Sequence, residues 1–163
     1  MKRRPHLLAW LGAILLAGGI AAVAILAFGN SSSKAAPTRA EYFAGVARIC
    51  GAYGPRLDAI APPSDVTIPG EVVTPLKRVI PLIRAETTEV RALATPPELA
   101  AKIDRWLALK QRVIASLEKT LHEAEAPDIA GTALAYIRFE KLARETSRAG
   151  AAIGFPGVCS SSS

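Results

Sequence analysis

The chain is poor in the side chains that most often bind metals or act as nucleophiles. Its 163 residues include two cysteines, two histidines and one methionine. Two histidines and two distant cysteines supply too few nitrogen and sulfur ligands for a closed zinc site. Two cysteines are also too few for a disulfide-dense small protein. Because half of the residues are hydrophobic and 21% are charged, disorder throughout the chain is excluded as well.

Catalytic motifs are missing too. The sequence has no haem-attachment motif C-x-x-C-H, no glycine-rich phosphate loop and no nucleophile elbow. Metal centres in helical bundles use Glu-x-x-His pairs, but Lys119 stands three residues before His122, and His6 lies in a basic segment. We therefore predict no catalytic residue, no metal site and no cofactor, and we expect that the chain is not an enzyme.

The longest uncharged run extends from Leu7 to Phe28. As a helix these 22 residues would span roughly 33 Å, which matches the hydrocarbon core of a bilayer. Lys2, Arg3 and Arg4 precede the run, so the amino end is expected in the cytoplasm and the rest of the chain outside it. We predict a cytoplasmic flank at 1–6, a transmembrane anchor at 7–28 and a flexible stalk at 29–37.

A cleaved signal peptide is the alternative interpretation of this run, and it would make the remainder a secreted protein. The apolar part of a signal peptide is about 7–15 residues long, and this run is longer, which favours a retained anchor. Three of the 20 basic residues precede Leu7 and all 14 acidic residues follow Phe28, so the remainder carries a formal charge of +3. Basic and acidic residues are mixed there, without clusters of basic and aromatic residues, which counts against nucleic-acid binding.

After residue 37 the apolar residues recur at helical spacing, and no strand-like alternation is found. Thr38 and Glu41 have the spacing of a capping box that begins a first helix, which Gly54-Pro55 is expected to kink or end. Its apolar stripe consists of Tyr42, Val46, Ile49, Tyr53, Leu57 and Ile60. A second helix is predicted to begin at Thr74-Pro75, and Pro81 is expected either to bend it or to move its start downstream.

Two further helices are predicted from similar signals. Thr95 and Glu98 form a second capping-box pattern, and the helix behind it is expected to run to about Ala126. Asp128 caps the last helix, which is expected to end at Gly154. The apolar residues of this last helix are Leu134, Ile137, Phe139, Leu142 and Ile153.

The predicted fold class is all-α, with the transmembrane helix followed by an antiparallel four-helix bundle over residues 38–159 and a disordered tail at 160–163. The alternative is a helical hairpin with loosely packed flanking helices, because Pro55 and Pro81 interrupt two of the segments.

The two cysteines, Cys50 and Cys159, both fall in the part predicted to lie outside the cytoplasm, where disulfides form. A bridge would close a loop of 109 residues and stabilise the domain by roughly 4–5 kcal/mol in the chain-entropy model. The alternative, a redox or intermolecular role, has less support because neither residue lies in a C-x-x-C motif.

Two aromatic residues, Tyr53 and Trp106, are candidates for lining a small-molecule cleft between helices, although their place on helical stripes favours a role in the core. Arg138, Arg144 and Arg148 form a basic edge on the last helix. That edge is predicted to be a solvated face or, as the alternative, a surface for acidic lipid or a partner.

Three segments carry a resemblance: YGPRLDAIAPPSDV, RALATPPELAAKIDRWLAL and the terminal AAIGFPGVC. Together with a cysteine in the first outer helix, they make the chain similar to a group of small bacterial exported or membrane-anchored helical proteins with no assigned function. The resemblance covers most of residues 42–159. It implies the paired cysteines and a helical fold, and it implies no activity.

These observations lead to two hypotheses about function. The first is a single-pass cell-membrane protein whose outer helical domain binds or scaffolds another envelope protein. The second is a carrier or sensor accessory that holds a small apolar ligand between its helices.

Overall fold

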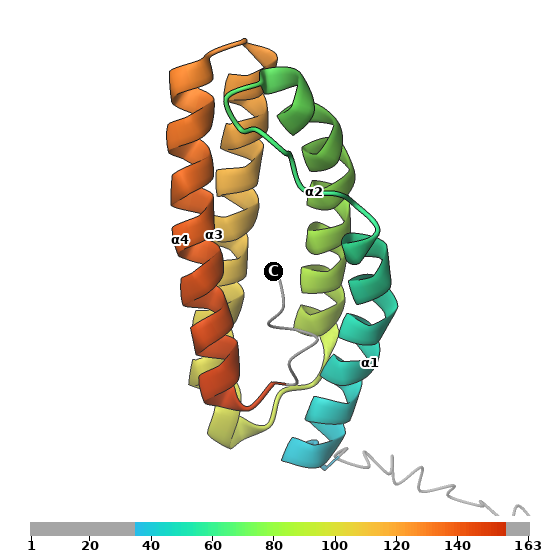
Figure 1. Cartoon of the computed structure of the whole chain (residues 1–163). Coiled ribbons are helices and arrows are strands. Elements are labelled where there is room, and N and C mark those ends of the chain that lie inside the picture. The colour runs from blue at the N-terminus through green and yellow to red at the C-terminus, as the bar shows by residue number, and fades with distance from the viewer. Residues whose placement is uncertain (1–34, 156–163) are drawn as a thin grey trace, which may run out of the picture. The chain divides into compact units, whose positions relative to one another are not determined.

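The computed structural model describes residues 35–155, and within that range it is all-helical (Figure 1). The helices are α1 (Arg39–Asp58), α2 (Pro69–Ala92), the short 3₁₀ helix η1 (Pro97–Leu99), α3 (Ala100–Glu125) and α4 (Ile129–Ile153). The prediction of an all-α chain with four helices after the stalk is confirmed for these residues. The predicted cytoplasmic flank, the anchor, most of the stalk, and the tail together with Cys159 lie outside them.

Successive helices run in opposite directions and pack against one another, α1 on α2, α2 on α3, and α3 on α4 (Figure 1). The buried side chains form two clusters. The first core cluster consists of Tyr42, Val46, Ile49, Cys50, Tyr53, Val90, Leu99, Ile103, Trp106, Leu107, Ile153 and Phe155. The second core cluster consists of Val72, Leu76, Ile80, Ile83, Val113, Ile114, Leu117 and Ala124.

The start of α1 follows the predicted capping box. The Thr38 hydroxyl accepts a hydrogen bond from the Glu41 amide at 3.2 Å, and the Glu41 carboxylate accepts one from the Thr38 amide at 2.8 Å. The interruption expected at Gly54-Pro55 is small, because Pro55 lies in the last turn and α1 ends three residues later, at Asp58. Ile60 lies beyond the helix and is still buried.

The predicted start of α2 is wrong. The helix begins at Pro69, and Pro75 lies inside it. A proline is well tolerated at the first helical position, and Pro75 removes only the hydrogen bond to the Glu71 carbonyl. The Glu71 carboxylate also accepts hydrogen bonds from the Ser64 hydroxyl and, at 3.2 Å, from the Asp65 amide, which ties the connector to the first turn.

The second predicted capping box is also wrong, whereas the cap of α4 is confirmed. Pro97 begins a 3₁₀ turn in which no side chain caps the amides, and the Thr95 hydroxyl lies 3.5 Å from the Leu93 carbonyl instead. Pro96 is extended, with ψ at 131°, so Thr95 is separated from the first turn. At α4 the Asp128 carboxylate accepts a hydrogen bond from the Gly131 amide at 2.9 Å.

Replacing Gly154 or Gly51 by alanine should change the stability of the fold in opposite directions. Gly154 ends α4 with φ at 97°, a conformation that L side chains avoid, so Gly154→Ala is expected to destabilise the fold by about 1–2 kcal/mol. Gly51 lies inside α1, where a methyl group would meet no atom within 4 Å. Gly51→Ala is therefore expected to stabilise the fold by about 0.5–1 kcal/mol. Urea unfolding of both variants measures the difference, and equal signs would refute the assignment.

Candidate binding surfaces

Tyr53 and Trp106 lie in the first core cluster, where they are 7% and 2% exposed. The Trp106 ring packs edge-on against Phe155 with centroids 4.9 Å apart. The Tyr53 hydroxyl donates a hydrogen bond to the Glu89 carboxylate at 2.5 Å. The structure thus brings the two predicted cleft residues together, but as parts of the packed core, and neither lines the two surface grooves described below.

A buried ion pair joins α2 to α3 beside this cluster. The Lys110 ammonium lies 2.8 Å from a Glu86 carboxylate oxygen and 5.4 Å from the centre of the Trp106 ring. Both side chains are at most 10% exposed. The sequence analysis missed this pair, although a signal existed: Lys110 stands four residues after Trp106, and Glu86 stands three after Ile83, on the apolar stripes of their helices.

Tyr42 is the one described side chain with a buried polar atom that finds no hydrogen-bond partner among the described residues. Its ring is 2% exposed and lies near Phe43 and Phe155. Burial raises the pKa of Tyr42 to about 12, and the carboxylate of Asp104 adds to the rise. The neutral hydroxyl is therefore the form that the folded chain holds.

The raised pKa of the Tyr42 hydroxyl predicts that the fold loses stability at high pH. An unfolded tyrosine ionises near pH 10, so the stabilisation is complete below pH 10 and is lost as the pH rises through about 12. Tyr42→Phe should remove that part of the loss and should be at least as stable at pH 7, because no hydrogen bond within the described residues is broken. Urea unfolding of both proteins between pH 8 and 11.5 provides the comparison. Parallel curves for the two proteins would contradict the prediction.

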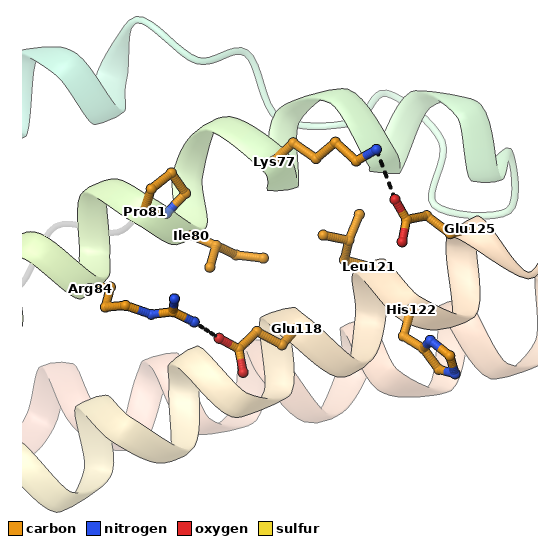
Figure 2. Close-up of a pocket in the computed structure, with 8 residues that line it drawn as sticks. All are labelled: Lys77, Ile80, Pro81, Arg84, Glu118, Leu121, His122 and Glu125. Atoms are coloured by element: carbon orange, nitrogen blue, oxygen red, sulfur yellow. Dashed lines mark hydrogen bonds and ion pairs between the residues drawn. The ribbon is translucent and has the colours of Figure 1, made fainter.

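A groove of about 320 Å³ runs along the outer side of α2 and α3 (Figure 2). Ile80 and Leu121 point toward one another across it, while the ring of His122 points away from them. Pro81 lies on the α2 side and has no amide to donate to the carbonyl of Lys77, which also lines the groove. The groove therefore has an apolar centre next to a weakened turn of α2.

An ion pair closes each end of the groove. Lys77 lies 2.8 Å from Glu125 at one end, and Arg84 pairs with Glu118 at the other. Both cations belong to α2 and both anions to α3, so one wall of the groove is positive and the other is negative (Figure 2). The side chains are 43% to 60% exposed, which leaves them accessible to a further partner.

The outer face of α4 differs from the prediction. Leu134 and Ile137 are predicted to face the core, yet they are 51% and 60% exposed, and Ile129 is 53% exposed. Small or polar residues are buried in their place, namely Thr132, Ala135 and Thr146. Threonine is tolerated there because its hydroxyl bonds to its own helix: Thr132 donates to Asp128 O at 2.7 Å and Thr146 to Leu142 O at 2.8 Å.

Basic residues continue this exposed face toward the carboxyl end of α4. Arg138, Lys141, Arg144 and Arg148 are all exposed. A shallow groove of about 420 Å³ runs beside them along the same helix, with Tyr136 and Phe139 at one end. Glu140 lies 3.6 Å from Arg144, and Glu145 lies four residues after Lys141, so acidic side chains are interspersed with these cations on α4.

Cys50 is 1% exposed within the first core cluster. No cysteine among the described residues is free. Its predicted partner Cys159 lies outside the described residues, so the bridge between the two stays a prediction. The burial of Cys50 counts against an accessible redox thiol, which needs exposure.

Within residues 35–155 no helix combines the length and the apolar character needed to cross a bilayer. In the same range no three side chains of His, Cys, Asp and Glu are grouped to hold a metal ion. No protein-family model matches the sequence, and the searches of curated proteins and of solved structures found no match.

Proposed function

We propose that the chain is a single-pass cell-membrane protein that binds a peptide segment of another envelope protein in the groove between α2 and α3. The apolar run Leu7–Phe28, with basic residues before it, supports the anchor and its orientation. Residues 38–159 then form an antiparallel four-helix bundle outside the cytoplasm. A Cys50–Cys159 bridge would tie the end of this bundle to α1.

The groove is the observation that carries the binding role. Its centre offers Ile80 and Leu121 to an apolar side chain, and its walls offer cations on α2 and anions on α3. A peptide with an apolar residue between acidic and basic ones complements this pattern, because each wall meets the opposite charge. A small uncharged ligand would use the volume but not the charges, so the structure favours a peptide.

The two ion pairs allow a test that preserves the contacts between α2 and α3. Exchanging the partners, Lys77→Glu with Glu125→Lys and Arg84→Glu with Glu118→Arg, keeps both pairs and inverts the charge of each wall. In membranes, a photo-crosslinking residue at Leu121, whose side chain points into the groove, should give an adduct with one protein. The adduct should fall about tenfold or more in the exchanged variant.

The control places the same crosslinker at Lys119, which is exposed on α3 and does not line the groove. Only background adduct is expected there. Equal adducts at both positions, or an adduct at Leu121 that the inverted walls leave unchanged, would contradict the groove as the binding site.

A further inference from the structure

The exposed face of α4 is a single stripe that changes character along the helix. Residues three or four apart share one side of a helix, and the stripe consists of Ala130, Leu134, Ile137, Lys141, Arg144 and Arg148. Its first half is apolar and its second half is basic. Three of the four large hydrophobic side chains that are exposed among the described residues belong to α4.

The basic half of this stripe lies at the end of the domain where the chain enters α1. Arg39, in the first turn of α1, donates a hydrogen bond to the carbonyl of Ile153 at 3.2 Å. The carboxyl end of α4 is thus beside the point at which the predicted stalk joins the domain (Figure 1). The basic half of the stripe therefore lies at the end of the described domain from which the predicted stalk departs.

We infer that the α4 stripe rests on an anionic phospholipid bilayer, with Lys141, Arg144 and Arg148 on the headgroups and Leu134 and Ile137 at the boundary with the acyl chains. The inference rests on the anchor of the proposed function. Exposed aliphatic side chains next to cations are the combination that binds the surface of an anionic membrane. The α4 segment has four basic and two acidic residues, so its formal charge of +2 complements such a surface.

The predicted stalk makes this contact reachable. Its nine residues, 29–37, extend to roughly 30 Å at most, which exceeds the diameter of one or two packed helices. A domain on such a tether stays at a high effective concentration next to the bilayer, so a weak surface contact is occupied for much of the time.

The test uses the full chain in nanodiscs, made either of phosphatidylcholine alone or with about a third of phosphatidylglycerol. A photo-crosslinking residue at Ile137 should give a phospholipid adduct, measured as added mass, several-fold more in the anionic nanodiscs. Replacing Lys141, Arg144 and Arg148 by glutamine should bring the yield down to that of the crosslinker at Lys119. Circular dichroism of each variant should show unchanged helix content.

The outcomes separate this inference from the proposal on which it rests. A chain that does not elute with the nanodiscs contradicts the anchor and, with it, the inference. A chain that elutes with them but gives equal lipid adducts at Ile137 and Lys119 contradicts the inference alone. In native membranes, an adduct at Ile137 with a protein instead of lipid would also overturn it.

Discussion

Replacing Glu86 by alanine is expected to lower the free energy of unfolding by about 3–5 kcal/mol. The change leaves the Lys110 ammonium buried, with its carboxylate partner at 2.8 Å removed. The ring of Trp106, 5.4 Å away, offers the cation only part of that interaction. Urea unfolding of the two proteins at pH 7 measures the loss.

Two further variants distinguish the effect of the buried ion pair on stability from that of an exposed ion pair. The double change Glu86→Leu with Lys110→Met removes both charges and should recover most of the stability, because a buried pair replaced by apolar residues is close to neutral. Lys119→Ala breaks the exposed pair with Glu123 and should cost about 0.5 kcal/mol or less. If Glu86→Ala behaved like Lys119→Ala, the pair would not be buried in solution.

Trp106→Ala should have an effect of similar size, about 3–5 kcal/mol, for a different reason. Trp106 is 2% exposed and packs against Phe155 inside the first core cluster, so its removal leaves a cavity. Unfolding monitored by circular dichroism gives the value, since the tryptophan signal itself is altered.

Leu134→Ala is the matched control for Trp106→Ala, because it also truncates a large apolar side chain. Leu134 is 51% exposed, so the change should stay within about 0.5 kcal/mol. A small loss for Trp106→Ala would mean that its ring lines an open cleft, as the small-ligand hypothesis requires, and does not fill the core.

The sequence predicted the starts of helices correctly where a side chain caps the first turn. Thr38 and Asp128 were identified as caps because a side-chain oxygen near a helix start has few other partners. The start of α2 was wrong because two prolines, Pro69 and Pro75, both suit a helix start, and only the contact of Glu71 with the connector favours the first. The inward residues of α1, which include Tyr42, Val46, Ile49 and Tyr53, followed from the spacing of its apolar residues.

The candidate sites could not be predicted in the same way. The face that α4 buries is decided by close packing on α3, which accepts Thr132 and Ala135 and leaves the larger Leu134 outside. The groove depends on which residues of α2 and α3 come opposite each other. That alignment follows from the packing of the second core cluster between the two helices, and no spacing within either helix reveals it.

The measurement that tests the account most directly is the location of the carboxyl end of the chain. An epitope tag placed after Ser163 should be removed by protease added to cells whose outer layers are open and whose cell membrane is sealed. The intact chain should sediment with the membrane and keep the mass that includes residues 1–28. A tag that the protease cannot reach, or a chain found only in the soluble fraction, would contradict a domain anchored outside the cytoplasm.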